Sequence, residues 1–262
     1  MGNTGSATLN IVNIASSTIK NGSVYGGYVG SGSATQNIVD IASSTINGGV
    51  WGGYVKGTGS ATENKVAIAN STVDGSVFGG YVYSGSATQN IVNIASSTAA
   101  DVHGGCVELS GNATQNIVDI AGSTVNSSVY GGRVDGTGSA TQNIVNISSS
   151  TVKNKVYGGN AGTGNATQNV VDISSSTTGA VYGGNADTGN ATLNKVDIIA
   201  SSTTSAVYGG YVKGTGSATQ NIVAIASSTV KGAVYGGKVN VTGNGDATNN
   251  TVEISGGSEV KG

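Results

Sequence analysis

Proline is absent from this chain of 262 residues, and cysteine, histidine and tryptophan occur once each. The lone Cys106 cannot form an internal disulfide, so stability must come from packing. Charged residues make up only 9% of the chain and the formal net charge is -2. This balance gives no electrostatic basis for binding nucleic acid or an anionic membrane surface. No apolar run is long enough to span a bilayer.

Glycine is abundant instead, with 45 residues, beside many Ser, Thr and Asn. Such a composition can indicate disorder, but disordered chains have few β-branched residues and a high net charge. Here hydrophobic residues make up 37% of the chain and Val and Ile recur at fixed places. We therefore expect a folded protein.

One sequence motif is repeated ten times along the chain, at spacings of 25 to 29 residues. Its phrase Gly-Ser/Asn/Asp-Ala-Thr begins at Gly5, Gly32, Gly59, Gly85, Gly111, Gly138, Gly164, Gly189, Gly216 and Gly245. A period of this size indicates a repeat array, in which each unit buries its apolar side against its neighbours.

In the first half of each repeat, constant and variable residues alternate over eight positions, and this alternation predicts a half-buried strand. In the second copy, Thr35, Asn37, Val39 and Ile41 share one face, and the same four residue types recur there in all ten copies. The residues between them vary. Because a packed interior tolerates less variation than a solvated surface, we expect the constant face, threonine included, to point inwards.

The inward asparagines are expected to form a ladder. Stacked at the interstrand spacing of about 4.8 Å, each amide can donate to the oxygen of the next, which favours parallel, in-register stacking of the repeats. The predicted ladder consists of Asn10, Asn37, Asn64, Asn90, Asn116, Asn143, Asn169, Asn194, Asn221 and Asn250.

The second half of each repeat reads Val-aromatic-Gly-Gly-x-Val, as in Val50 to Val55. The predicted aromatic row consists of Tyr25, Trp51, Phe78, Tyr130, Tyr157, Tyr182, Tyr208 and Tyr235, with His103 as the exception. Two interpretations are open. Either the glycine pair is a bulge or corner that lets both valines face inwards, with the aromatic row outside, or Trp51, Gly53 and Val55 point in. We favour the first.

These patterns predict an all-β parallel β-solenoid with one coil of two or three short strands per repeat of about 26 residues. We expect residues 1–262 to form one domain of nine full repeats and a partial tenth, without evident caps. Uncapped coils offer unpaired backbone groups to another chain. Excision from a longer array and a subunit that stacks end to end both remain open.

The phrase Asp-Ala-Thr-Asn-Asn-Thr-Val-Glu-Ile-Ser-Gly-Gly at residues 246–257 and the recurring Val-Tyr-Gly-Gly resemble tandem repeats in the passenger regions of bacterial autotransporters and related surface adhesins. The resemblance covers nearly all of the chain. It implies a parallel β-solenoid displayed outside the cell, on a bacterial surface. An export signal and a C-terminal membrane barrel are absent from these residues, and Met1-Gly2-Asn3-Thr4 is not a signal peptide, so the resemblance implies a fragment, an engineered chain or a divergent relative.

An aliphatic stripe is expected along the outside of the rod, where it marks a partner surface or an aggregation hazard. This isoleucine stripe consists of Ile11, Ile38, Ile91, Ile117, Ile144, Val170 and Ile222, interrupted by Lys65 and Lys195. The alternative is that isoleucine only favours strands. We favour lateral contacts with other copies. The aromatic row could bind sugars, but stacked aromatics also stabilise neighbouring strands, and we favour that structural role.

No catalytic, cofactor or metal site is predicted. The outward Asp40, Asp119, Asp172 and Asp197 lie in a row, whereas calcium needs oxygens that converge on one point. His103 and Cys106 lack the third, orienting group that nucleophilic catalysis requires. We therefore expect no enzyme, no cofactor and no metal.

The sequence favours a non-enzymatic extracellular structural or adhesive solenoid that associates with itself, end to end into fibres. One alternative is a module that binds a polysaccharide or a host surface. Another is an ice-binding protein. The expected inward direction of Thr35, Thr88 and Thr141 argues against it. A polysaccharide-cleaving β-helix enzyme would need a break in the repeat with charged groups in a groove, which the sequence does not contain. We expect no nucleic-acid partner and no membrane insertion.

Overall fold

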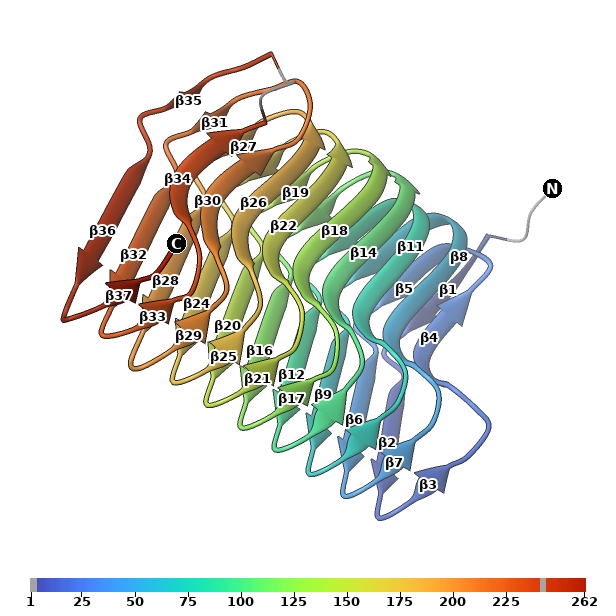
Figure 1. The fold of residues 1–262 in the computed structure, drawn as a ribbon. Helices are drawn as coiled ribbons and strands as arrows, with labels where there is room; N and C mark the ends of the chain where they lie inside the picture. Colours follow the sequence, from blue (N-terminus) through green and yellow to red (C-terminus); the bar gives the residue numbers. More distant parts are fainter. Residues whose placement is uncertain (1–3, 241–243) are drawn as a thin grey trace.

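The computed structural model describes residues 4–240 and 244–262, so the tripeptide Met1-Gly2-Asn3 considered above lies outside the described residues. The chain is an all-β parallel β-solenoid of about nine turns of about 27 residues. Figure 1 shows the coils stacked from the N-terminal end to the C-terminal end. The predicted fold class is confirmed. The described residues contain no helix that is long and apolar enough to cross a membrane.

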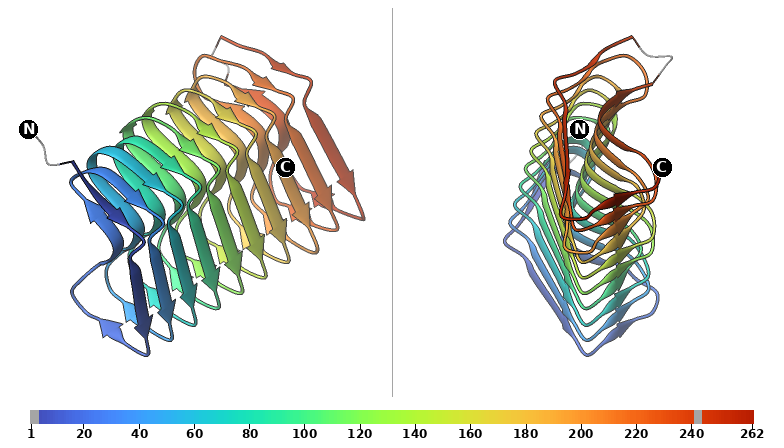
Figure 2. Two further views of the ribbon diagram at one scale, coloured as in Figure 1. Left: turned by 180° about the vertical axis from the view of Figure 1, so that it is seen from behind. Right: turned by 60° about the vertical axis from the view of Figure 1, so that its left-hand side comes forward.

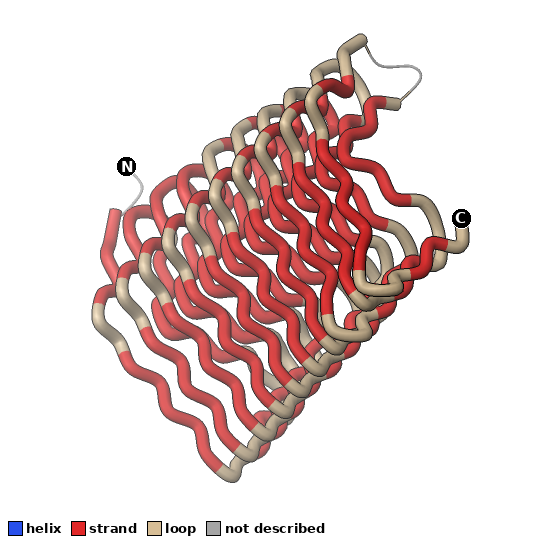
Figure 3. Tube along the Cα trace, turned by 90° about the vertical axis from the view of Figure 1, so that its left-hand side faces the viewer, coloured by secondary structure: helices blue, strands red, loops and turns tan. Residues whose placement is uncertain are grey.

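Three parallel sheets run along the rod, as the views in Figures 2 and 3 show. The isoleucine sheet consists of β2 (Ile11–Ala15), β6 (Ile38–Ala42), β9 (Lys65–Ala69), β12 (Ile91–Ala95), β16 (Ile117–Ala121), β20 (Ile144–Ser148), β24 (Val170–Ser174), β28 (Lys195–Ile199), β32 (Ile222–Ala226) and β36 (Thr251–Ser255). The threonine sheet consists of β3 (Thr18–Ile19), β7 (Thr45–Ile46), β10 (Thr72–Val73), β13 (Thr98–Ala99), β17 (Thr124–Val125), β21 (Thr151–Val152), β25 (Thr177–Thr178), β29 (Thr203–Thr204), β33 (Thr229–Val230) and β37 (Glu259–Val260).

The long sheet holds the aromatic and Ala-Thr segments of every repeat. It consists of β1 (Thr4–Thr8), β4 (Val24–Val29), β5 (Ser31–Thr35), β8 (Val50–Thr62), β11 (Val77–Thr88), β14 (Val102–Ser110), β15 (Ala113–Thr114), β18 (Val129–Thr137), β19 (Ala140–Thr141), β22 (Val156–Thr163), β23 (Ala166–Thr167), β26 (Val181–Thr188), β27 (Ala191–Thr192), β30 (Val207–Val212), β31 (Ala218–Thr219), β34 (Val234–Val239) and β35 (Ala247–Thr248). Each coil therefore has three sides.

Pairing between strands of adjacent coils places equivalent residues of the repeat beside each other. In the isoleucine sheet Ile91 pairs with Ile117 and Ile94 with Ile120, as the repeat predicts. In-register parallel pairing lets one side-chain row continue through every coil, so a single favourable contact is repeated along the rod.

The predicted eight-residue alternation is wrong at one place. The strand stops at Thr35 because Gln36 adopts a left-handed backbone with φ 55°, and a new strand begins at Ile38. The corner turns the preceding strand, so Ala34 is buried and Thr35 is half-buried on the other side. The threonine row therefore faces outwards, and alanine takes the inward position in its place.

The glycine pair produces a kink, which settles the two interpretations of the second half. Val50 and Val55 are both fully buried, whereas Trp51 between them is only half-buried. The pairing of β8 with β11 passes from Trp51 to Gly53 and leaves Gly52 out, without a change of register there. The kink recurs in all nine of these segments, so the residues on either side of it, valine or, at Ala161 and Ala186, alanine, face inwards and the aromatic row lies outside.

Two apolar compartments form the core. The larger one packs Val and Ile from all three sheets, among them Val118, Ile120 and Val125. The smaller one packs Val and Ala within the long sheet and is divided into two clusters, which contain Val107 and Ala113 in one and Ala186 and Val212 in the other. The asparagines and the Gly-Gly kinks lie between these two compartments.

Candidate functional site

The ten asparagines predicted as a ladder lie on adjacent coils, and their side chains are joined by hydrogen bonds. Asn143 Nδ2 donates to Asn169 Oδ1 at 2.9 Å and to the carbonyl of Ala113 at 3.0 Å. Asn143 Oδ1 accepts from the backbone N–H and from the Nδ2 of Asn116, at 3.0 and 2.9 Å. Every polar group of this fully buried amide is thus satisfied. The end residues are less buried: Asn10 is exposed and Asn250 is half-buried.

The ladder explains the two glycines. A Cβ on Gly132 would lie 2.5 Å from Asn143 Cγ, and one on Gly131 would lie 2.5 Å from the carbonyl oxygen of Gly158. Because the amide presses directly on the kinked strand, no side chain fits there. The sequence shows both features, but not that they touch.

A second buried ladder was not predicted. Ser123 Oγ donates to the carbonyl of Ala121 at 2.7 Å and accepts from the backbone N–H of Ser97 at 3.1 Å. A serine recurs at this position of the corner in every copy, and in most copies the corner reads Ser-Ser-Thr. The ten serines are Ser17, Ser44, Ser71, Ser97, Ser123, Ser150, Ser176, Ser202, Ser228 and Ser258. The presence of this serine in all ten copies was the signal that could have identified it, as it did for asparagine.

The isoleucine stripe lies on the outer face of the isoleucine sheet. Ile11 is 64% exposed and Ile222 is 42% exposed, while the members between them are half-buried. A groove of about 470 Å³ borders the stripe on the side of the corner glutamines, between residues such as Gln115 and Ile117. The middle of the stripe therefore projects beside this groove.

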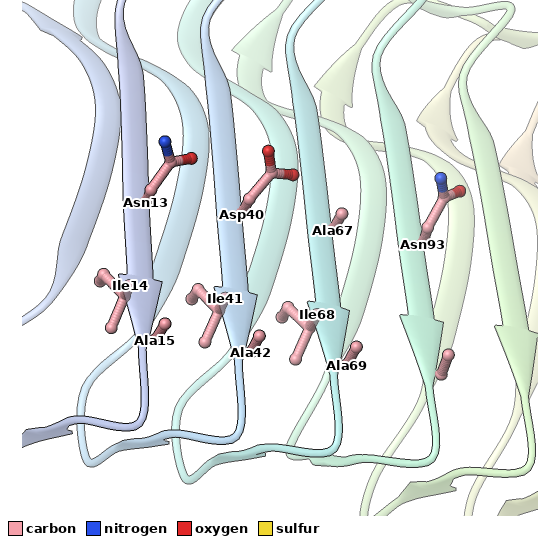
Figure 4. A pocket seen from close by; sticks show the side chains of 11 residues that line it. Asn13, Ile14, Ala15, Asp40, Ile41, Ala42, Ala67, Ile68, Ala69 and Asn93 are labelled. Atoms are coloured by element: carbon pink, nitrogen blue, oxygen red, sulfur yellow. The ribbon is translucent and has the colours of Figure 1, made fainter.

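The second depression lies beyond a polar row, where each strand ends in a small residue. It is a hollow of about 420 Å³ over the first four coils, and another of about 260 Å³ continues it. Figure 4 shows Asn13, Asp40 and Asn93 pointing away from the strands beside the small side chains of Ala15 and Ala42. We call the depression over Ala15, Ala42, Ala69, Ala95 and Ala121 the alanine trough.

The outward acidic row does not converge. Asp119 Oδ1 accepts from Asn146 Nδ2 at 2.6 Å, and Asp197 forms an ion pair with Lys195. Burial and the neighbouring Asp197 raise the pKa of the Asp172 carboxyl. Within residues 4–240 and 244–262, no three His, Cys, Asp or Glu side chains come together in a way that could hold a metal ion.

The aromatic row is stacked face to face along the rod. Ring centroids are 4.5 Å apart between Phe78 and His103 and 5.6 Å apart between Trp51 and Phe78, with planes within 11° of parallel. A second row, which the sequence analysis missed, packs edge-on against it: Tyr54 meets Trp51 at an interplanar angle of 86°. Since neighbouring rings cover one another, the row presents mainly edges to solvent.

His103 and Cys106 occupy the aromatic row and the row beside it. Burial lowers the pKa of His103 to about 3, with the Arg133 cation acting in the same direction and Asp101 opposing it. Burial raises the pKa of the Cys106 thiol to about 12. At neutral pH the thiol is therefore protonated, and both side chains are sealed from solvent, so the pair cannot supply an accessible thiolate nucleophile.

No protein-family model matches the chain, and neither a curated protein nor a solved structure matches it. Its function must therefore be argued from its own residues.

Proposed function

We propose that this chain is a non-enzymatic structural solenoid that acts outside the cell, on a bacterial surface, and associates with other copies of itself. The resemblance of its repeats to those of surface adhesins supports this location. Association end to end extends the rod, and association side by side bundles it.

The observation that carries the proposal is the repeated in-register pairing of coil on coil. The two edge strands of the isoleucine sheet are β2, which pairs with β6, and β36, which pairs with β32. Both pairs align the same positions of the repeat as the strand pairs between them. A coil from a second copy continues the asparagine and serine ladders at either edge without any new type of contact. Ile254 is 49% exposed and Ile11 is 64% exposed at these edges, so stacking would also bury apolar surface.

Electron microscopy of the purified chain across a concentration series tests this proposal. We expect filaments whose length grows with concentration. An Asn10→Lys variant should shorten them, because it places a charge in the ladder at the joint, whereas Asn21→Lys on the exposed loop of the same coil should not. Single short rods at every concentration, with no larger species in light scattering, would contradict self-association.

Glycan binding is the alternative function that the aromatic row suggests, and the stacking of its rings weakens it. Sugars pack on ring faces, which the neighbours of Tyr157 occupy on both sides. If the chain nevertheless binds a polysaccharide and loses that binding on replacement of Tyr157 and Tyr182 by Ala, this alternative replaces the structural role.

Ice binding is a second candidate, and one observation favours it. Thr35, Thr88 and Thr141, expected inside, lie half-buried on the outer side, which removes the objection raised from the sequence. In the first four coils the residues two positions earlier are serines, which form a short parallel hydroxyl row, as in the contact of 3.3 Å between the Ser33 and Ser60 Oγ atoms. A sample without thermal hysteresis or ice shaping would eliminate this candidate.

A further inference from the structure

We propose that two copies of this chain pair side by side with their rod axes parallel, through the outer faces of their isoleucine sheets. The isoleucine stripe of each copy enters the alanine trough of the other. This inference rests on the proposed self-association and names its lateral interface.

The first argument is the surface shape of this face. Along four of the first five strands the outward positions hold, in order, the stripe, the polar row and the trough, as in Ile117, Asp119 and Ala121, whereas the third strand has Lys65 and Ala67 in the first two positions. A groove borders the stripe at Ile91, Ile117 and Ile144, and the trough runs parallel to the stripe on the far side of the polar row, at the same spacing between coils. One face thus carries both a projecting apolar row and a recess for such a row.

The second argument is symmetry. A two-fold axis along the rod reverses the strand direction, so it sets the start of each strand against the end of its counterpart, stripe against trough, on both sides at once. A two-fold axis along the strands would instead set stripe against stripe and leave the two troughs facing each other as a void. Only the parallel arrangement fills the recess.

The third argument is area. Strands of five residues at roughly 3.3 Å each, in ten coils at roughly 4.8 Å, give a face of roughly 750 Å² per copy, or roughly 1,500 Å² for two. Specific interfaces bury about 1,600 Å² in total. The five coils with the trough supply about half of this area, roughly 750 Å² for two copies, so the whole face must pair to reach the range for specific complexes.

The eighth coil departs from the pattern on both rows. Ile199, which is 45% exposed, stands where the trough would continue, and Lys195 stands in the stripe of the same strand. Lys65 also interrupts the stripe within the coils that carry the trough, where it would face Ala69 of the other copy. Asp40 and Asp119 lie in the central polar row, where each would meet its own copy, so like charges oppose the pairing.

Sedimentation equilibrium tests the pairing with variants that the chain itself shows to be tolerated. Ile117→Lys places a lysine in the stripe, as Lys65 does in its own coil. Ala121→Ile places an isoleucine at the trough position, as Ile199 does in its own coil. Asn126→Lys is the matched control, because it lies in the same coil, on another face, in a row that already holds Lys153.

We expect the unmodified chain to dimerise, with Kd about tenfold higher in Ile117→Lys and in Ala121→Ile, and unchanged in the control. Lys65→Ile should lower Kd. Equal Kd values for the stripe variant and the control would overturn the pairing. In microscopy, filaments one rod wide without lateral pairs would overturn the pairing but leave end-to-end association intact, whereas monomers alone would overturn both.

Cross-linking determines the orientation. Two variants with one added cysteine each, Ile38→Cys and Ala42→Cys, are mixed and treated with a short bismaleimide. Parallel pairing predicts more 38-to-42 product from the mixture than 38-to-38 or 42-to-42 product from either variant alone. The native Cys106 is 4% exposed with a protonated thiol, so it does not compete. Predominant 38-to-38 product would contradict the parallel arrangement.

Discussion

The asparagine ladder inside the coil and the polar row on the outside of the isoleucine sheet carry similar side chains at the same spacing along the rod. Inside, Asn143 makes four hydrogen bonds and the same residue type recurs in all ten coils. Outside, the row changes between Asn, Asp, Ala and Glu, and the Oδ1 atoms of Asn93 and Asp172, although buried, have no partner among the described residues. The difference indicates that burial of the whole side chain, rather than residue type, makes a polar row indispensable, because a fully enclosed amide has no water to replace a lost partner.

The largest expected effect comes from breaking the inner ladder. Asn143→Leu removes the acceptor of the Asn116 backbone N–H and side-chain amide and leaves both donors buried. Each unsatisfied buried group costs about 1–3 kcal/mol, so we expect a loss of about 4 kcal/mol in the free energy of unfolding. Urea denaturation followed by circular dichroism measures it. A loss below about 1 kcal/mol would contradict the ladder as the main polar constraint.

The glycine that faces the ladder should be nearly as sensitive. Gly132→Ala places a methyl group against Asn143 and should cost about 3 kcal/mol through overpacking. In an Asn143→Ala background the methyl group enters the vacated space, so the same change should cost much less. This double-mutant cycle isolates the contact, and additive effects would show that the two residues do not oppose each other.

His103 is a buried polar side chain outside either row, with an Nδ1 atom that has no partner among the described residues. Its pKa is lowered to about 3 in the folded protein. Between pH about 6.5 and about 3, the imidazole is therefore protonated in the unfolded chain and neutral in the folded chain. Stability should fall by about 1.4 kcal/mol per pH unit as the pH drops from about 6.5 to about 3. His103→Tyr, which copies Tyr130 of the next coil, should abolish this part of the acid sensitivity in thermal unfolding.

The serine ladder should be weaker than the asparagine ladder because each hydroxyl makes fewer bonds. Ser123→Ala removes the acceptor of the Ser97 N–H, and we expect a loss of about 1–2 kcal/mol. The same denaturation experiment checks this value. A cost equal to that of Asn143→Leu would remove the proposed ranking of the two ladders.

The smallest effect is expected on the outside. Asp119→Ala copies Ala67 and Ala224 of the same row and should change the free energy of unfolding by less than about 0.5 kcal/mol. A cost above about 1 kcal/mol would mean that the outer row is also structural.

The sequence was sufficient to predict the solenoid, the parallel register and the inner asparagines, because a period of identical residues constrains which strands can pair. It did not predict the direction of Thr35. That direction depends on the left-handed backbone of Gln36, and glutamine gives no signal for such a conformation. The contact between Gly132 and Asn143 was also missed, since it joins different sides of the coil, and so was the edge-on second aromatic row.

The most direct test of the comparison is hydrogen exchange of the asparagine side-chain amides, measured by NMR on the assigned protein. The account predicts strong protection at the buried ladder positions, such as Asn116 and Asn143, and rapid exchange at the outward Asn13 and Asn93. Similar exchange rates at the inner and outer asparagines would contradict the ladder and, with it, the explanation of the repeated glycine pair.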